Sequence, residues 1–460
     1  MQESRFSFSI KTMGCKANLF DSLVLEQELI GLGGEALADQ HQKPDVVILN
    51  SCTVTQEADK QAHQWLQQSH KKNESGFRVV TGCYAEVAPE KLKQDPNASL
   101  VLKNTEKHHL RSILAERFNI STPPDATPGE SVVPGSEAVY WGQLPIERGK
   151  TRAFLKIQEG CNDYCTYCII PDARGPSRSI RLGSILSEIQ RLVDAGVKEV
   201  VLTGTNIADY GKDCDLTFED LVSSILVKTN ILRLRLSSLD PGEITDRLLD
   251  LMRDHAARLM PHLHISLQSA NSRVLRAMKR HYREAEIESA LSSIYALNPD
   301  IFVGMDVIAG FPSETDDEHK SALALLSRLP WSRLHVFPYS EREGTAALKI
   351  APKVPQQTRK QRTKEFLDLS KKRNYSFCEK FVGKTLQNIL FESHHEVAGE
   401  CFAVGHAPNY LRCVLSTGFG ADALTRAMEL KNTVKDVNVV GVHELGSQEY
   451  GLLVTNSPTT

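Results

Sequence analysis

The sequence predicts an α/β protein in three parts: an N-terminal doubly wound parallel domain, a larger parallel sheet curved into a full or partial barrel, and a small all-β barrel. Three observations predict this architecture. Strand-like apolar runs alternate with helical periodicity over most of the 460 residues. A segment rich in Pro, Gly and Ser interrupts this alternation. From about residue 379 the pattern changes to short strand-like runs separated by turns.

The first domain is assigned to residues 1–120. Its strands are "RFSFSIKTMGC", which alternates apolar and polar residues, and "PDVVILNSC" and "GFRVVTGC", which are short apolar runs typical of buried parallel strands. The stretches "LFDSLVLEQELIGLGG" and "ADKQAHQWLQQSHKKN" between them have helical spacing. Residues 121–147, which include "STPPDATPGESVVPGS", are predicted to be a linker.

Residues 148–378 continue the helix–strand alternation without a hairpin signal. The helix "SILSEIQRLVDAG" precedes the strand "KEVVLTG", and four further helices precede "LRLRLSSLDP", "HLHISLQS", "IFVGMDVIAGFP" and "SRLHVFPYS". Such repeated units predict a parallel sheet curved into a full or partial barrel. Residues 379–450, with runs such as "KTLQNILFES" and "YLRCVLST", predict the all-β barrel.

Composition limits the possible partners. The formal net charge of −3 gives no overall attraction to nucleic acid, so local basic patches would have to hold a polyanion. No stretch approaches the roughly 20 apolar residues of a membrane span, and the N-terminus lacks the features of a signal peptide. We expect a cytoplasmic protein without a membrane partner. In that reducing compartment its ten cysteines favour metal ligation or catalysis over disulfides.

Three cysteines, Cys161, Cys165 and Cys168, fall within "EGCNDYCTYC" at C-x3-C-x2-C spacing. Thiolates suit iron–sulfur clusters and zinc, but a structural zinc site needs a fourth protein ligand, and the next cysteine is Cys214. A [4Fe-4S] cluster held by three cysteines keeps one iron open for a substrate or cofactor. The stretch follows the strand "TRAFLKIQEG", so in a barrel it lies at the C-terminal face. The alternatives are a zinc loop with a distant fourth ligand and three unrelated core cysteines.

A second set of cysteines, Cys15, Cys52 and Cys83, ends the three predicted strands of the first domain. Ligands of open parallel sheets bind beyond the carboxyl ends of the strands, so these three loops can bring their thiols together. Helices begin soon after each cysteine, and their N-termini would stabilise thiolates. The alternative is that each cysteine packs as a small apolar residue. That packing role is the one assigned to the remaining cysteines: Cys214, Cys378, Cys401 and Cys413.

The C-x3-C-x2-C stretch, with Tyr167 before its last cysteine, resembles the signature of radical S-adenosylmethionine (SAM) enzymes. The resemblance implies a partial (β/α) barrel and an open iron that chelates the amino and carboxylate groups of SAM. It further implies that one electron cleaves SAM to a 5′-deoxyadenosyl radical. Tyr167 is then expected to contact the cofactor.

The three N-terminal cysteine motifs, a radical-SAM domain and a small β-barrel together resemble the methylthiotransferases, over about residues 5–450. The resemblance implies that Cys15, Cys52 and Cys83 hold an auxiliary [4Fe-4S] cluster whose open iron carries the sulfur. It also implies insertion of a methylthio group at an unactivated carbon, with two SAM molecules used per turnover. General acid–base chemistry cannot act on such a C–H bond, whereas a carbon radical can take the hydrogen.

Four short stretches resemble the subgroup that acts on threonylcarbamoyladenosine next to the anticodon of tRNA: "GCKAN" (14–18), "LTGTNIADYGKD" (202–213), "LRLSSLDP" (234–241) and "FPYSEREGTAA" (337–347). The subgroup acting on isopentenyladenosine typically has Gln-Met after the first cysteine, and the subgroup acting on a ribosomal-protein aspartate has Pro-Lys. These two subgroups are the alternatives. The alternative from another class is a zinc-bearing RNA-binding protein without catalysis.

Further SAM contacts are expected where predicted strands end. The resemblance places Thr203 and Gly204 at the strand end that contacts the SAM amino group, and Gln268, Asp306 and Gly310 at strand ends facing the same cavity. Each could instead serve as a turn residue or bond within the barrel. Arg174 and Arg178, just past the cysteines, are expected either to face substrate phosphates or to be exposed on the surface.

The C-terminal block resembles the TRAM domain of RNA-modifying enzymes, but 379–460 holds six Lys and Arg against nine Asp and Glu. The stretch 353–373, with eight basic and two acidic residues, is therefore the candidate for holding RNA, with a solvated helix face as the alternative. Tyr410 and Phe402 could stack on bases, but we favour core positions for both. The expected partners are tRNA and an electron donor such as a flavodoxin or ferredoxin, while the sulfur donor is unassigned.

Overall fold

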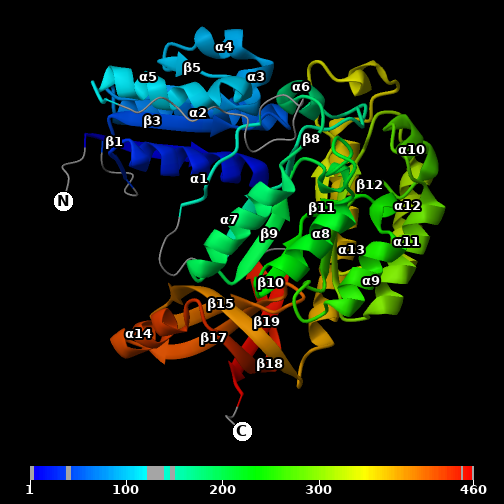
Figure 1. Ribbon diagram of the computed structural model, residues 1–460. Coiled ribbons are helices and arrows are strands. Elements are labelled where there is room, and N and C mark those ends of the chain that lie inside the picture. Colours follow the sequence, from blue (N-terminus) through cyan, green and yellow to red (C-terminus); the bar gives the residue numbers. More distant parts are fainter. Residues whose placement is uncertain (1–4, 38–42, 122–138, 146–150, 447–448, 458–460) are drawn as a thin grey trace.

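The computed structural model describes residues 5–37, 43–121, 139–145, 151–446 and 449–457. It has the predicted α/β architecture with a small barrel at the C-terminal end (Figure 1). Most of the segment predicted as a linker, at 122–138 and 146–147, lies outside the described residues. No helix in the described ranges is both long and apolar enough to cross a membrane.

The N-terminal sheet is parallel throughout, with strand order β2-β1-β3-β4-β5. Its strands are β1 (Phe6–Thr12), β2 (Gly34–Ala36), β3 (Val46–Ser51), β4 (Phe77–Gly82) and β5 (Leu100–Val101). Helices α1 (Lys16–Gly31) and α5 (Leu110–Arg117) pack on one face, and α2 (Gln56–Lys72), α3 (Cys83–Val87) and α4 (Pro89–Lys93) pack on the other. Neighbouring strand residues such as Ile48 and Leu49 belong to different cores, so the sheet is doubly wound as predicted.

The central domain is a curved wall of parallel strands. One part has the order β10-β9-β6 and the other β11-β12-β13-β14, and only Ser237 separates β10 from β11. The strands are β6 (Arg152–Lys156), β9 (Glu199–Thr203), β10 (Arg233–Leu236), β11 (Ser238–Leu239), β12 (His262–Gln268), β13 (Phe302–Ala309) and β14 (Arg333–Pro338). Among the described strands β6 and β14 do not pair, so the barrel is partial.

Helices cover only the outer side of this wall (Figure 1). They are α7 (Leu182–Asp194), α8 (Phe218–Lys228), α9 (Asp246–Asp254), α11 (Glu284–Leu297), α12 (Asp316–Arg328) and part of α13 (Gln356–Glu379). Outward strand residues such as Val200, Leu234 and Leu263 join them in one core. Because side chains alternate along a strand, the residues between them face inward, and these are mostly polar or charged.

The C-terminal barrel is closed, with strand order β15-β16-β17-β19-β18. Its strands are β15 (Thr385–Val397), β16 (Glu400–His406), β17 (Arg412–Phe419), β18 (Val434–Gly446) and β19 (Glu449–Asn456). The prediction missed helix α14 (Ala421–Leu430), which links β17 to β18 and packs Ala427 into the barrel core. The barrel closes the base of the central wall, where the Arg235 guanidinium donates to the Pro408 carbonyl at 3.1 Å.

Candidate active site

The local trio, Cys161, Cys165 and Cys168, forms one turn just after β6 and β7 (Gln158–Glu159). The Cys168 amide donates to the Cys165 carbonyl at 3.0 Å, and the Cys161 amide donates to the Gly175 carbonyl at 3.2 Å. Burial raises the pKa of Cys168 to about 12, with a contribution from Cys165, and it raises the pKa of Cys161, with a contribution from Cys168, so the three thiols share one neighbourhood. The donor set therefore fits a metal cluster bound through three sulfurs.

Arg280 supports this trio from the loop after α10 (Ser272–Ala277). Its guanidinium donates to the Cys165 sulfur at 3.1 Å and pairs with Asp240. Burial raises the pKa of Asp240 to about 6, against the opposing pull of Arg280. A guanidinium on a ligand sulfur stabilises the negative charge that the sulfur carries when it binds a metal.

The distributed trio, Cys15, Cys52 and Cys83, comes from three loops at the carboxyl ends of β1, β3 and β4. A Cβ atom at Gly14 would lie 2.6 Å from the Cys52 sulfur, so the first two loops touch there. At Gly82, where φ is +95°, a Cβ would lie 2.3 Å from the Ser51 carbonyl oxygen. Both glycines are therefore required by close approach as well as by backbone conformation.

Burial dominates the titration of one member of the distributed trio, Cys52, in the metal-free protein. It raises the pKa of Cys52 to about 11, and the charges of Cys83 and Cys15 raise it further. Helices do begin after these cysteines, with Cys15 capping α1 and Cys83 starting α3. The expected stabilisation of thiolates by helix N-termini is nevertheless outweighed at Cys52, so a metal would have to displace its proton on binding.

A short helix, α6 (Ile170–Arg174), joins the two trios. It begins two residues after Cys168 and packs against α3, which starts at Cys83. The Asn104 amide donates to the Ala173 carbonyl at 2.7 Å and lies 4.0 Å from the Cys83 sulfur. A helix of this length rises only about 7 Å. A cavity of about 740 Å³ opens beside α3 and α6, with Tyr84, Glu86, Ile169 and Asp172 in its wall.

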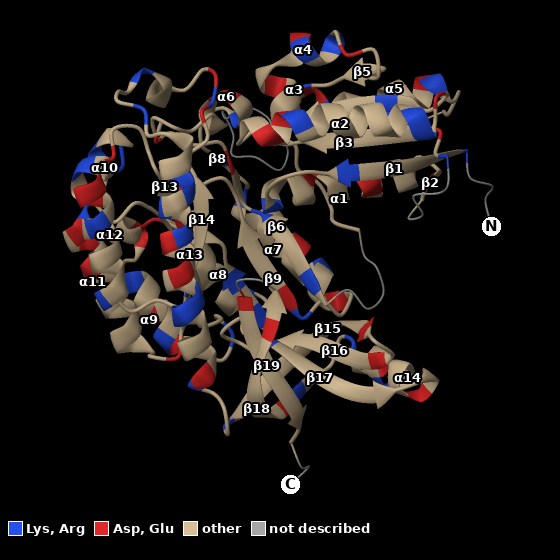
Figure 2. Ribbon diagram, turned by 180° about the vertical axis from the view of Figure 1, so that it is seen from behind, with Lys and Arg blue, Asp and Glu red and all other residues tan. Residues whose placement is uncertain are grey.

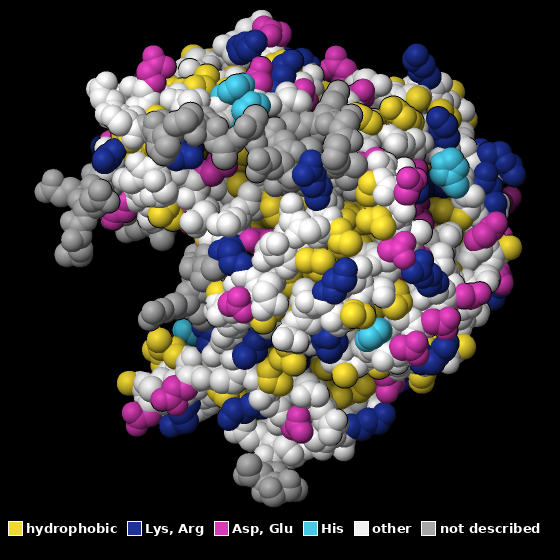
Figure 3. All heavy atoms as spheres, viewed as in Figure 1, with side chains coloured by type: hydrophobic (Ala, Val, Ile, Leu, Met, Phe, Trp, Pro, Cys, Tyr) yellow, Lys and Arg dark blue, Asp and Glu magenta, His cyan; other side chains and the backbone are white. Residues whose placement is uncertain are grey.

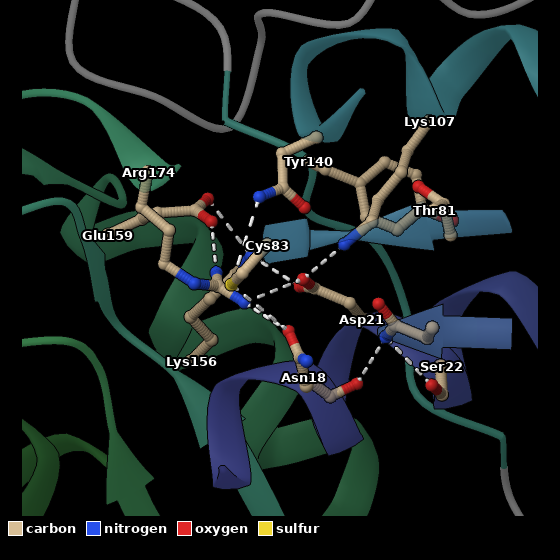
Figure 4. A network of polar contacts seen from close by, with 12 residues as sticks. Asn18, Asp21, Ser22, Thr81, Cys83, Lys107, Tyr140, Lys156, Glu159 and Arg174 are labelled. Carbon is tan, nitrogen blue, oxygen red and sulfur yellow. Dashed lines mark hydrogen bonds and ion pairs between the residues drawn. The ribbon is translucent and has the colours of Figure 1, made fainter. Parts of the chain in front are cut away.

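Arg174 lies in a buried network of charges between the N-terminal and central domains (Figure 4). Its guanidinium pairs with Glu159 and donates to the Asn18 side chain, close to Cys83. Asp21 accepts from Lys107 at 2.7 Å and from Lys156 at 2.6 Å. Burial acts to raise the pKa of Asp21, but the charges of Lys107, Lys156 and Arg174 hold it well below its usual range.

The expectation for Arg174 and Arg178 is therefore wrong in one respect: neither is on the surface. Arg174 is 4% exposed and Arg178 is 6% exposed. Buried carboxylates hold the Arg174 guanidinium inward, and the Arg178 side chain donates to the Arg174 carbonyl at 2.6 Å. Two of the Arg174 partners, Asn18 and Asp21, lie 156 and 153 residues away, so the local sequence held no sign of them.

Two of the expected SAM contacts, Thr203 and Gly204, lie at the end of β9 beside β6. Thr203 is buried, and its carbonyl accepts from the Ile157 amide at 2.9 Å. A Cβ atom at Gly204 would lie 2.9 Å from the Gln158 carbonyl oxygen, so only glycine fits there without displacement. Tyr167 packs edge-on against Phe311, with 6.4 Å between ring centroids.

The remaining three expected contacts differ in position. Gln268 ends β12 with φ +58°, and Gly310 directly follows β13 with φ +73°. Asp306 is not at a strand end, because β13 continues to Ala309. Its carboxylate lies between His264 Nε2 at 3.0 Å and His335 Nδ1 at 3.5 Å, inside the partial barrel. Those hydrogen bonds hold the pKa of Asp306 below its usual range although burial acts to raise it.

The basic stretch 353–373 forms much of α13, and part of its charge is used within the protein. Arg362 is buried and pairs with Glu314 and Asp316 at 2.7 Å, and Arg359 pairs with Glu341. Lys360 and Lys364 are exposed. Figure 2 shows basic and acidic residues together along α13. Figure 3, which views the molecule from the other side, shows basic and acidic side chains intermixed on that surface. Cys378, Cys401 and Cys413 are buried, as expected of packing residues, and Cys214 is half-buried.

Tyr410 is held between the C-terminal barrel and the base of the central wall. The Arg235 guanidinium lies 4.6 Å from its ring centroid, and its hydroxyl accepts from Arg152 at 3.3 Å. Phe402 is half-buried on β16 and stacks on His395, with 5.4 Å between centroids. Tyr410 thus serves the junction between these two domains.

Comparisons with known proteins agree with this geometry. The sequence profile of the radical SAM superfamily matches residues 155–326, and that of the uncharacterized protein family UPF0004 matches residues 7–103. A "threonylcarbamoyladenosine tRNA methylthiotransferase MtaB" of Aquifex aeolicus is 36% identical over 84% of this chain and 93% of that protein. The protein of the same name from Bacillus subtilis is 33% identical over 88% and 89%. A "tRNA-2-methylthio-N(6)-dimethylallyladenosine synthase" of Aquifex aeolicus is 30% identical over 84% and 88%.

Among solved structures, the radical SAM methyltransferase TsrM of Kitasatospora setae aligns over 85% of this chain and 79% of its own. The TM-score is 0.52 at 15% sequence identity, so this likeness concerns the fold alone. The partial barrel and its three-cysteine turn define a radical SAM enzyme, a class that implies SAM and a [4Fe-4S] cluster as cofactors. With the second domain and these relatives, the chain belongs to the radical SAM methylthiotransferase family.

Two contributors were missed from the sequence alone, Arg280 and Asn18. Asn18 belongs to the "GCKAN" stretch. The Asn18 amide donates to the carbonyls of Met13 and Ser51 at 2.8 and 2.9 Å, which joins two of the cysteine loops. A polar residue three positions after a strand-end cysteine was the available signal. Arg280 offered none, because it is 115 residues from the sulfur that it contacts.

Proposed function

We propose that this protein inserts a methylthio group at C2 of N6-threonylcarbamoyladenosine next to the anticodon of tRNA, and acts in the cytoplasm. The observation that carries the proposal is the set of relatives named for this activity, which are 30–36% identical over at least 82% of the chain. The "GCKAN" stretch after β1 agrees with that subgroup.

We assign the local trio to the [4Fe-4S] cluster that binds SAM, and the distributed trio to a second [4Fe-4S] cluster. When bound, the first cluster supplies the electron that cleaves SAM to a hydrogen-abstracting radical, and the second supplies the sulfur. The chain's own groups hold these sites in place: Arg280 donates to the Cys165 sulfur, and Asn18 joins the loops of the distributed trio. A flavodoxin or ferredoxin is the proposed electron donor.

The connection between the trios supports action on one nucleobase. Helix α6 begins two residues after Cys168 and packs against α3, which starts at Cys83, and the buried pairs of Arg174 and Asp21 hold the two domains against each other. The inner face of the central wall offers polar groups to SAM and substrate, with Thr203, Gly204, Gln268 and Gly310 near the carboxyl ends of its strands. Tyr167 and Asp306 complete the proposed SAM contacts, Asp306 from deeper in the wall.

A second candidate substrate is dimethylallyl-modified adenosine, because relatives named for that synthase activity are 30–31% identical over at least 83% of the chain. Nucleoside analysis of tRNA from a strain lacking the gene separates the two substrates. Loss of methylthiolated threonylcarbamoyladenosine, restored by the gene but not by a Cys161→Ala version, is the expected result. An unchanged threonylcarbamoyl series with loss of the methylthio-dimethylallyl form would contradict the proposal.

A further inference from the structure

Lys16 lies between the distributed trio and the inner face of the central wall. It directly follows Cys15 and is the first residue of α1, which packs against β6. Its ammonium lies 5.8 Å from the centroid of the Phe154 ring. Phe154 alternates with the core residues Ala153 and Leu155, so it belongs to the inner face of the wall. Lys16 therefore reaches from the distributed trio toward the inner face.

The arginines near the base of that face already have partners within the protein. Glu199 accepts from Arg235 at 3.0 Å, and its carboxylate lies 2.8 Å from Arg152 Nε and 3.7 Å from Arg233. Arg152 also pairs with Glu392 of the C-terminal barrel. This cluster has more arginines than carboxylates. Arg233 and Arg235 also donate hydrogen bonds to carbonyl groups of the C-terminal barrel.

The polar side chains next along the inner face also bond to one another. Asp306 accepts from His264 and His335 on the neighbouring strands. Its single carboxylate is thus engaged on both sides.

Lys16 differs from all of these groups. Within the described ranges its ammonium has no hydrogen bond or ion pair, and its side chain is exposed. Solvent thus reaches the side chain, although the Phe154 ring lies beside its ammonium. A cation in such a place, with no carboxylate to pair with, is suited to an anionic ligand.

We propose that Lys16 binds the threonyl carboxylate of the substrate, forming a carboxylate subsite that selects threonylcarbamoyl over isopentenyl adenosine. The inference rests on the proposed function and extends it. C2 and the carbon bearing N6 are separated by a single ring atom, so a base with C2 toward the distributed trio carries its N6 substituent near the same trio. An isopentenyl group is apolar and gains nothing from a cation, whereas a carboxylate gains a charge-assisted hydrogen bond.

The test compares the reconstituted holoenzyme with three variants, Lys16→Met, Lys16→Arg and Lys11→Met. Lys11 is the matched control, an exposed lysine on β1 four residues before Cys15. Each enzyme is given tRNA carrying threonylcarbamoyladenosine, and the same tRNA with the threonyl carboxylate converted to its methyl ester. The measured quantity is kcat/KM for methylthio insertion.

Lys16→Met is expected to lose about 10- to 100-fold on the carboxylate substrate, the range for a hydrogen bond to a charged group. Lys16→Arg should keep most of the activity, and Lys11→Met should match the wild type. On the ester, the wild type should fall to the level of Lys16→Met, and that variant should lose nothing further. Equal wild-type turnover of acid and ester would overturn the inference.

Two readouts besides turnover exclude other roles. Iron and sulfide content, and SAM cleavage without tRNA, should be the same in Lys16→Met and wild type. Loss of iron would mean that Lys16 serves the distributed trio, and loss of SAM cleavage would mean that it binds the SAM carboxylate; either result overturns the inference. A wild-type enzyme inactive on threonylcarbamoyl tRNA would overturn the proposed function itself. Wild-type turnover with an unaffected Lys16→Met would overturn the carboxylate subsite alone.

Discussion

The two cysteine trios are built in opposite ways. The local trio comes from one turn of eight residues, Cys161 to Cys168, in which the Cys168 amide donates to the Cys165 carbonyl. The distributed trio comes from three strand ends and spans 69 residues, from Cys15 to Cys83. The first depends mainly on local conformation. The second depends on strand register, on two glycines and on the packing of one domain against another.

The largest expected effect concerns which reaction step each trio supports. Replacing Cys161, Cys165 or Cys168 by Ala should abolish SAM cleavage, because each removes a ligand of the proposed SAM-binding cluster. Replacing Cys15, Cys52 or Cys83 should spare SAM cleavage and block methylthio insertion. The assay quantifies 5′-deoxyadenosine and methylthiolated nucleoside in the same reaction. Equal loss of cleavage in both sets would break the comparison.

The next effect tests the dependence of the distributed trio on domain packing. Arg174→Met leaves Glu159 and Asp21 short of a buried partner, which costs about 3–5 kcal/mol. The control is Arg247→Met, which removes an exposed pair with Asp220 worth at most about 1 kcal/mol. Urea unfolding of the two variants measures the difference. Equal stability would show that the network between the domains contributes nothing.

A smaller effect is expected at the glycine that admits Cys83. Gly82→Ala combines a positive φ with a clash against the Ser51 carbonyl, which costs about 2–4 kcal/mol. Gly183→Ala is the control: it lies in α7, meets no atom within 4 Å, and should be neutral or slightly stabilising. Thermal unfolding and iron content report on both. We expect Gly82→Ala to lose only the iron of the distributed trio. Loss of iron from both trios would contradict the claim that the local trio forms independently of this glycine.

The smallest effect is a dependence on pH. The pKa of Asp21 is held below its usual range in the folded protein, so its contribution to stability is present above about pH 4 and declines as the pH falls below that. The metal-free protein should lose about 1 kcal/mol by pH 3 through this group. Asp21→Asn should be less stable at pH 7 and lack that component. An identical pH profile in both proteins would contradict the assigned role of Asp21.

Much of this architecture was predictable because topology and periodicity determine it. Apolar runs located the parallel strands, and the carboxyl-end rule anticipated that the loops of Cys15, Cys52 and Cys83 would meet. The rule needs no knowledge of side-chain packing. It was less reliable for Asp306, which lies within β13, because strand ends are the least certain feature of a sequence-based assignment.

Contacts between distant segments were not predictable. Arg174 follows the local trio and has the sequence context of a surface residue, yet it pairs with residues from both domains. Arg362 lies in the most basic stretch of the chain, yet Glu314 and Asp316 draw it inward. Helix α14 was missed because the surrounding strand-like runs dominated the assignment of the C-terminal block. For the two arginines the deciding partners are remote in the sequence. For α14 the strand-like pattern around it outweighed the helical signal.

The central claim is that each trio holds its own four-iron cluster. Iron and sulfide counts on anaerobically purified wild type and on the Cys15→Ala/Cys52→Ala/Cys83→Ala variant test it most directly. Two clusters predict about eight iron and eight sulfide per wild-type chain, and about four of each in the variant. About four in both proteins, or zinc without sulfide, would contradict it.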